Sequence, residues 1–288
     1  MKTAIVSDSN CGMNEREATD LGIHLIPMPV VINQHSYFEG KDLDYLDFLQ
    51  YLIDGEKVTT SQPSPADLMM TWEMLLQKGY DEIIYIPMSS GLSSSFQTAN
   101  MIAQDYPGKV YVVDAHRISV TQRHAVLDAL ALLKEGLSAV EIRTILEENA
   151  YQSFSFVGVD DIGFLKRGGR ITPSAAMIAS VLNIKPLLQI RGEKIDSYEK
   201  IRGTRKCQKE LLKVMQEKSS EFEGRRCRID VAGSFLEWKD AEIWLKMARK
   251  AFPDYTIQYY PLTCSISCHT GPNAFGMGIS VCLSDQNI

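Results

Sequence analysis

The first half of the chain alternates short apolar runs with helical patterns, and this alternation limits the possible folds more than any other feature. Apolar runs at 4–7, 83–88 and 110–114 are typical of buried strands, and helical spacing of apolar residues follows, as over 65–78 and 120–134. Strands that alternate with helices form βαβ units, because a parallel neighbour is reached through a crossover connection. The sequence therefore predicts a mostly parallel, three-layer α/β/α sheet.

The second half of the chain has a different pattern. Two strand-like segments flank Arg191-Gly192-Glu193, which predicts a hairpin and hence antiparallel pairing. Because 288 residues exceed one ordinary domain, we expect an N-terminal α/β domain over 1–153 and a C-terminal mixed-sheet α/β domain over 154–288. The elements predicted for the second domain are strands at 154–159, 185–190, 194–201, 228–233, 256–260 and 278–283, and helices at 206–218 and 240–252.

Composition narrows the classes of function. The net charge of −6 argues against a nucleic-acid-binding protein. The sequence shows no run of about 18 apolar residues and no charged leader followed by an apolar segment, so we expect neither a transmembrane helix nor a signal peptide. The predicted location is the cytoplasm, and transient contact with a membrane remains compatible with it.

The six cysteines do not form a metal-binding or disulfide pattern. Cys264, Cys268 and His269 are close in sequence, but no second pair of ligands at a fitting spacing accompanies them. A disulfide scaffold is usually shorter and richer in cysteine. We therefore expect no metal site, and thiols that are reduced and mostly buried.

Two hydroxyl-rich turns mark a candidate binding site. Thr60-Ser61-Gln62-Pro63-Ser64-Pro65 and Ser89-Ser90-Gly91-Leu92-Ser93-Ser94-Ser95 each precede an apolar helical pattern. Ser64 is interpreted as a helix cap, with proline at the first helical position. The remaining hydroxyls exceed what capping needs. Because they lie where strands end and helix dipoles begin, the turns predict a site for a small anion such as a carboxylate or phosphate.

Single residues elsewhere fit the same interpretation. His269 precedes a Gly-Pro turn, and its imidazole can donate to an anion or to a hydroxyl that holds one. Arg170 follows two glycines, which allow the backbone to approach a ligand or partner closely. The alternatives without a binding function are a structural role for His269 and a solvated surface charge in a turn for Arg170.

A basic cluster stands out in this acidic chain. Lys200, Arg202, Arg205 and Lys206 occur within seven residues at the start of a predicted helix. Cations at a helix N-terminus oppose the helix dipole, so they do not serve helix stability. We interpret this basic cluster as a docking surface for an acidic partner or for phosphate groups, against the alternative of a solvated surface.

Sequence motifs for catalysis are missing. The chain lacks a G-x-S-x-G elbow, a P-loop and a dinucleotide fingerprint, so we expect no catalytic residues and no cofactor. Two alternatives stay open. One is an acyl hydrolase that uses Ser93 as nucleophile with His269 and Asp8, and the other is a binding module for a different anion such as a sugar phosphate.

Taken together, the turns resemble those of the DegV family. Their order along the chain matches that family from about residue 3 to 283, with one departure at Ser94-Ser95-Phe96, where members often have Gly-Thr-Tyr. The residues that carry the resemblance are Val6-Ser7-Asp8-Ser9, Thr60-Ser61-Gln62-Pro63-Ser64-Pro65, Ser89-Ser90-Gly91-Leu92-Ser93, Leu165-Lys166-Arg167-Gly168-Gly169-Arg170-Ile171, Asn183-Ile184-Lys185-Pro186 and His269-Thr270-Gly271-Pro272.

The resemblance implies a two-domain α/β protein that binds a long-chain fatty acid, such as palmitate, between its domains. By the same resemblance, Thr60 and Ser93 would hold the carboxylate, and Ser61, Arg170 and His269 would form the supporting network. Some members serve a bacterial fatty acid kinase as its lipid-carrying subunit. They present the acid to a separate catalytic subunit for ATP-dependent phosphorylation. The implied role is therefore non-catalytic, in lipid transport and in fatty acid and phospholipid metabolism.

Overall fold

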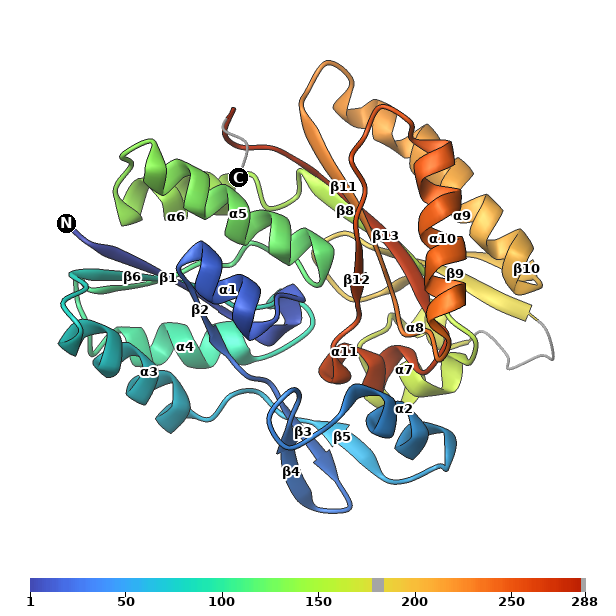
Figure 1. Ribbon diagram of the computed structural model, residues 1–288, viewed down its shortest axis with the longest axis horizontal. Coiled ribbons are helices and arrows are strands. Elements are labelled where there is room, and N and C mark those ends of the chain that lie inside the picture. The colour runs from blue at the N-terminus through green and yellow to red at the C-terminus, as the bar shows by residue number, and fades with distance from the viewer. Residues whose placement is uncertain (178–183, 286–288) are drawn as a thin grey trace.

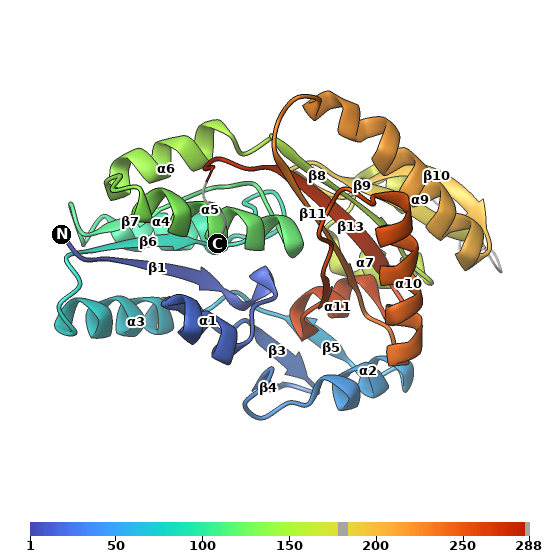
Figure 2. The same cartoon turned by 45° about the horizontal axis from the view of Figure 1, so that its top comes forward.

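The two larger β-sheets stand side by side in the molecule, and helices cover their faces (Figures 1 and 2). The computed structural model describes residues 1–177 and 184–285. Asn183, part of one motif that carries the resemblance, lies outside the described residues. The two sheets confirm the expected α/β class with one parallel and one mixed sheet, whereas the boundary at 153/154 stays a prediction.

The N-terminal sheet is parallel throughout and has the strand order β2-β1-β6-β7. Side chains alternate along its strands, so that Ile5 and Ile84 face α1, α5 and α6, while Val6 and Ile83 face α3 and α4. This is the predicted three-layer arrangement. Its elements are β1 (Thr3–Asp8), β2 (Ile23–Ile26), β6 (Glu82–Ile86), β7 (Val110–Val112), α1 (Glu15–Leu21), α3 (Pro65–Gln77), α4 (Ser95–Ala103), α5 (Val120–Lys134), α6 (Ala139–Glu148) and a 3₁₀ turn, η1 (Ser9–Cys11).

The C-terminal sheet is mixed and has the order β10-β9-β8-β13-β11-β12. All its pairs are antiparallel except β11–β12. Two helices, α9 and α10, bury one face of the sheet, with Met215 and Trp244 packed against Phe156 and Phe275. The elements are β8 (Ser153–Gly158), β9 (Ile184–Ile190), β10 (Asp196–Arg202), β11 (Cys227–Gly233), β12 (Tyr259–Pro261), β13 (Phe275–Val281), α9 (Thr204–Ser219), α10 (Trp238–Ala251) and a 3₁₀ turn, η2 (Ser220–Phe222).

A smaller layer, whose sheet is not predicted from the sequence, joins the two halves below the sheets in Figure 1. Its sheet has the order β4-β3-β5, and α11 contacts α7, α2 and β5. The residues before Gly169 are helical, and the helix ends at Gly169 in the left-handed conformation. The elements are β3 (Pro29–Ile32), β4 (His35–Phe38), β5 (Val58–Thr60), α2 (Tyr45–Ile53), α7 (Ile162–Gly168), α8 (Pro173–Ala176) and α11 (Cys264–Thr270).

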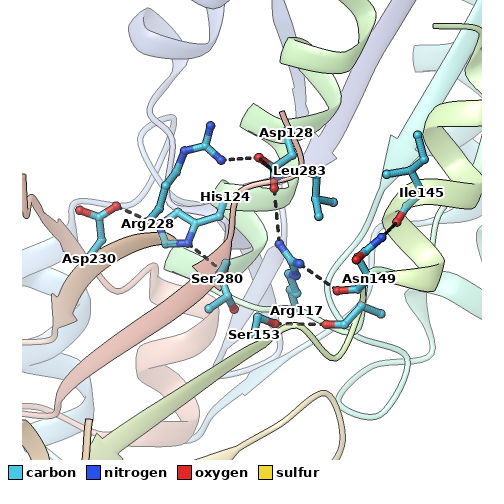
Figure 3. A network of polar contacts seen from close by, with 12 residues as sticks. Arg117, His124, Asp128, Ile145, Asn149, Ser153, Arg228, Asp230, Ser280 and Leu283 are labelled. Atoms are coloured by element: carbon cyan, nitrogen blue, oxygen red, sulfur yellow. Dashed lines mark hydrogen bonds and ion pairs between the residues drawn. The ribbon is translucent and has the colours of Figure 1, made fainter. Parts of the chain in front are cut away.

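Helix α5 connects the two sheets through a buried charged network (Figure 3). The Asp128 carboxylate accepts a hydrogen bond from Arg228 of β11 and lies 3.8 Å from Arg117 Nη1, which leads into α5. Arg117 also donates to the carbonyl of Asn149 at 3.1 Å. Because Arg117 and Asp128 are fully buried, each charge depends on the others for compensation.

A second polar contact of α5 lies beside this network (Figure 3). The His124 ring is placed between Ser280 of β13, at 3.0 Å, and the Asp230 carboxylate of β11, at 2.9 Å. Burial lowers the pKa of His124, although Asp230 opposes the shift. The imidazole is therefore neutral near pH 7, and its two nitrogens bind one residue from each of two strands.

Candidate functional site

A cavity lies between the two sheets, and residues from both halves of the chain form its walls. It holds about 110 Å³ of free space, and its lining is mainly apolar, with a few hydroxyls, an arginine and a histidine. Concave apolar sites with a small number of directed polar groups are typical of small-molecule binding sites. The apolar wall includes Met28, Met88, Leu92, Val157, Ile190 and Ile266.

Thr60 and His269 form a hydrogen-bonded pair at this cavity. Thr60 ends β5, which pairs with β3, and His269 lies in the last turn of α11, so the small lower layer brings them together. The two atoms, Thr60 Oγ1 and His269 Nε2, are 2.9 Å apart. When Nε2 carries the imidazole proton, it donates to Thr60, and the threonine hydroxyl keeps its own hydrogen for an anion in the cavity.

The imidazole of His269 is held neutral. Burial, and secondarily the nearby Arg170 guanidinium, lower its pKa to about 4. Gly168, at the end of α7, lies against the other side of the ring, where a Cβ would be 2.2 Å from His269 Nδ1. Only glycine leaves room for the ring at this position. This explains the first glycine of the Gly168-Gly169 pair, which the sequence analysis noted only as allowing close approach.

Ser93 presents its hydroxyl at the start of α4. Its Oγ accepts a hydrogen bond from Ser95 N at 3.1 Å and lies 2.9 Å from Ser95 Oγ. The turn is closed by Leu92 N and Ser93 N, which both donate to the carbonyl of Ser89. When Ser95 Oγ is the donor in this contact, the Ser93 O–H remains available to donate, and the Ser93 side chain lines the same cavity as Thr60 and His269.

The serine turn is clamped by the second half of the chain. Ser89 Oγ donates to the carbonyl of Gly192 in the β9–β10 turn, and a Cβ on Gly91 would meet Glu193 Cα at 2.7 Å. Arg170 Nε donates to the Leu92 carbonyl at 3.3 Å. The turn residues of both halves therefore fix one another, which the sequence alone did not indicate for Gly192.

The remaining predicted site residues have different placements. Ser61 borders the cavity, but its hydroxyl donates to the Gln62 carbonyl and does not contact the Thr60–His269 pair. The basic cluster is exposed at the end of β10 and the start of α9, and none of its four residues lines the cavity. Within it, Arg205 donates to Gln208 Oε1 at 3.2 Å.

An open cleft of about 750 Å³ adjoins the cavity and shares Thr60, Arg170 and His269 with it. Lys57 and Arg167 also line this cleft, and neither forms an ion pair with any residue in 1–177 or 184–285. We define this feature as the basic cleft. Lys57 is not predicted from the sequence, because a lone lysine before a strand carries no distinguishing pattern.

The residues of the hydrolase alternative are not assembled into a triad. His269 Nε2 contacts Thr60, and Ser93 contacts Ser95. Asp8 is fully buried under the ends of β1 and β6, where it accepts hydrogen bonds from Met88 N at 2.8 Å and Gln122 Nε2 at 3.0 Å. Burial raises the pKa of Asp8 to about 6 despite these bonds.

The cysteines are free thiols in the part of the chain that the structure describes. Cys11, Cys207, Cys264 and Cys268 are buried, whereas Cys227 and Cys282 are partly exposed, and all six are free. Within residues 1–177 and 184–285, no three His, Cys, Asp or Glu side chains are arranged to hold a metal ion. No described helix is both long enough and apolar enough to span a bilayer.

Comparison with known proteins identifies relatives over nearly the whole chain. A family model described as "Uncharacterised protein, DegV family" matches residues 2–281. A DegV domain-containing protein of Listeria monocytogenes is 29% identical over 284 residues, which are 97% of this chain and 99% of that protein.

Solved structures show the same similarity in three dimensions. One, described as showing fatty acid binding of a DegV family protein from Thermus thermophilus, is 28% identical with a TM-score of 0.88, and the match covers 98% of this chain and 100% of that one. Another, described as DegV, a fatty acid binding protein from Bacillus subtilis, is 29% identical with a TM-score of 0.84 and covers 98% and 99%.

Proposed function

The chain belongs to the DegV family, and from this premise we propose that it binds a long-chain fatty acid in the cavity between its two sheets. One observation carries the proposal: a mainly apolar cavity whose hydroxyl and imidazole groups meet at Thr60, Ser93 and His269. An apolar chain with a single anionic end has the same distribution of polarity. The description of the relatives from Thermus thermophilus and Bacillus subtilis as fatty acid binding supports the same ligand class.

In this proposal the head group and the tail contribute differently. Thr60 and Ser93 donate hydrogen bonds to the carboxylate, and neutral His269 orients the Thr60 hydroxyl. The tail provides most of the affinity, at about 0.8 kcal/mol for each buried methylene group. Hydroxyl donors leave the carboxylate oxygens more reactive than a two-pronged arginine contact would. That property suits a carrier whose cargo is modified at its carboxylate by another protein.

We further propose that the chain has no catalytic activity of its own and presents the acid to a separate fatty acid kinase subunit in the cytoplasm. The basic cleft supports this role, because it opens the head-group end of the cavity to a phosphoryl donor and lines the approach with Lys57, Arg167 and Arg170. Among the described residues Ser93 Oγ hydrogen-bonds to Ser95, and His269 Nε2 contacts Thr60. These contacts favour a carrier over an acyl hydrolase, since a serine nucleophile needs a general base within hydrogen-bonding reach.

The experiment that tests the proposal is mass spectrometry of the lipid that copurifies with the full chain, followed by titration of the delipidated protein with palmitate. We expect a fatty acid in stoichiometric amount and saturable rebinding. A copurified sugar phosphate, or no binding of any acid of 14 to 18 carbons, would contradict the proposal. Incubation with a fluorophosphonate probe separates the hydrolase alternative, because covalent labelling of Ser93 would identify a nucleophile.

A further inference from the structure

The wall of the cavity carries two serine hydroxyls that the protein leaves without partners. Ser119 and Ser155 both line the cavity. Neither side chain forms a hydrogen bond with any residue in 1–177 or 184–285, in contrast to Ser93, whose hydroxyl is part of a closed turn. Ser119 precedes α5 at the position of the helix cap, yet its side chain does not cap the helix.

The two hydroxyls belong to neighbouring elements. Ser155 lies in β8 opposite Ile190 of β9 and Gly278 of β13. At Gly278, a Cβ would be 2.9 Å from Ser155 Oγ and 2.7 Å from Val120 Cγ2, so the first turn of α5 lies against the same point of the sheet as Ser155. The absence of a side chain at Gly278 lets the residues that follow Ser119 approach Ser155.

This position is separate from the head-group end. The cavity and the basic cleft share Thr60, Arg170 and His269, which marks the opening, and neither Ser119 nor Ser155 borders that cleft. Ser265, a third cavity hydroxyl without a hydrogen-bond partner among the described residues, lies one turn before His269 on α11 and so belongs to the head-group end. Ser119 and Ser155 lie apart from this opening, and in the proposed binding mode they are assigned to the part of the cavity that the acyl chain fills.

An unsubstituted acyl chain is a poor match for this wall. Methylene groups would remove water from both hydroxyls and give them no hydrogen bond, and an unpaired hydroxyl is unfavourable in an apolar site. A ligand hydroxyl can donate to one serine and accept from the other, since each serine has one hydrogen and two lone pairs. Apolar residues such as Val157 and Met277 line the same cavity, so a hydroxylated chain would meet both apolar and polar groups there.

We propose that the cavity recognises a fatty acid that carries a hydroxyl group along its chain, through Ser119 and Ser155. The inference rests on the proposed fatty-acid-binding function and specifies its ligand class. The head-group contacts with Thr60 and Ser93 are common to all fatty acids, whereas the serine pair discriminates among them by the presence and position of the hydroxyl.

The test is a comparison of dissociation constants for stearate and its 2-, 10-, 12- and 18-hydroxy derivatives, measured by calorimetry on the delipidated full chain. We expect at least one isomer hydroxylated beyond carbon 2 to bind roughly tenfold more tightly than stearate, from one added hydrogen-bonded pair. In Ser155→Ala the preference should fall to about twofold or less, and stearate itself should bind more tightly than to the parent. Ser119→Ala should shift the preference in the same direction.

Ser153→Ala is the matched control. Ser153 lies two residues earlier on the same face of β8, but its hydroxyl donates to the Ala150 carbonyl and it does not line the cavity. We expect its preference among the acids to equal that of the parent. Three outcomes would each overturn the inference. One is a hydroxylated isomer whose affinity advantage persists in Ser155→Ala, and another is a loss of stearate affinity in that variant. The third is a higher affinity for oleate than for stearate when no hydroxylated acid shows a higher affinity.

The outcomes also separate this inference from the proposed function. If stearate binds and no hydroxylated isomer gains affinity, the serine pair is occupied by ordered water and only the inference is wrong. If no acid binds, stearate included, the fatty-acid function itself is wrong, and the inference fails with it.

Discussion

The Nε2 atom of His269 lies 2.9 Å from the Oγ1 atom of Thr60, although the two residues are 209 positions apart in the chain. The contact joins the end of β5 to the last turn of α11 across the cavity wall. A neutral imidazole that donates to Thr60 fixes the direction of the threonine hydrogen. The chain thus prepares a donor for an anion before the anion arrives, which reduces the ordering cost of binding.

Removing either hydroxyl donor should weaken fatty acid binding without unfolding the protein. Thr60→Val keeps the shape of the side chain and removes its hydroxyl, and Ser93→Ala does the same in the serine turn. The loss of one hydrogen bond to a charged group should reduce affinity by about 1.5–3 kcal/mol, which calorimetry with palmitate would measure. Thr59→Val is the control, because Thr59 is exposed and does not line the cavity. Parental affinity in both hydroxyl variants would show that the carboxylate lies elsewhere.

A methyl group at Gly168 should disturb the site through His269. In Gly168→Ala the new Cβ would occupy a point 2.2 Å from His269 Nδ1, so the ring must shift and its contact with Thr60 is disturbed. We expect a loss of palmitate affinity about as large as that in Thr60→Val, while the helical content of the protein is retained. Gly163→Ala, in the same helix but against the flexible Asp161 and Arg167 side chains, should bind palmitate like the parent. Equal affinity in both variants would show that the ring position is unimportant.

The regular elements of this fold follow from local patterns in the sequence. The predicted helix over 120–134 has those bounds in the structure, and Ser64 caps α3 through a reciprocal bond with Asp67. Periodicity and capping are properties of neighbouring residues, so they are visible in one sequence. The hairpin around Gly192 is also confirmed.

The small lower layer was not predictable in the same way. Its strands have three or four residues, too short for alternation to register, and the run 23–32 divides between two sheets around Pro27. Helix α11 has seven residues, of which six are buried, so it has no amphipathic pattern. The residue types of the site were predictable from the sequence. The contact between Thr60 and His269 was not, because it is formed by this layer and depends on tertiary structure.

His269 should make the free protein less stable in acid. Its pKa is lowered to about 4 in the folded state from 6.5, so between these values the unfolded chain binds more protons and folding stability falls as the pH falls. From pH 7 to 5 the loss should be roughly 2 kcal/mol. Asp8 acts in the opposite direction, because its folded-state pKa is raised to about 6 and the folded protein gains that proton first.

Comparison of the parent with His269→Gln isolates the histidine, since Asp8 contributes equally to both proteins. Glutamine keeps a donor for Thr60 and does not titrate. Urea unfolding is measured at pH 7 and at pH 5. Between these values the free energy of unfolding of the parent should fall by about 2 kcal/mol more than that of the variant. The same difference at both pH values would mean that His269 titrates alike in the folded and unfolded chains.

The charged network around α5 should be essential for stability. In Asp128→Asn, Arg117 and Arg228 would lose the carboxylate that compensates them, and breaking a buried ion pair typically costs about 3–5 kcal/mol. Urea unfolding measures this loss. The exposed Asp105→Asn should change the free energy of unfolding by no more than about 0.5 kcal/mol. A comparably small effect at Asp128 would mean that the arginines are hydrated in solution.

The basic cluster is expected to matter for the partner and not for the ligand. Lys200, Arg202, Arg205 and Lys206 are exposed and lie away from the cavity lining, so their charges are free to steer an acidic surface. The start of α9 also has no side-chain cap, which leaves these cations against an uncompensated helix dipole.

Reversing Arg202 and Arg205 to glutamate should leave palmitate affinity unchanged and slow phosphorylation of the bound acid by a cognate kinase subunit. Charge steering acts over a Debye length of about 8–10 Å, so raised salt should slow the parent in the same way and affect the variant less. Lys78→Glu with Lys109→Glu makes the same change in net charge at exposed positions of the other half and should support the kinase like the parent. The measurement is the initial rate of phosphorylation at low salt and limiting carrier concentration, compared among the charge-reversed protein, its control and the parent. If the charge-reversed protein equals the parent there, the cluster is a solvated surface and the kinase docks elsewhere, with the basic cleft as the next surface to mutate.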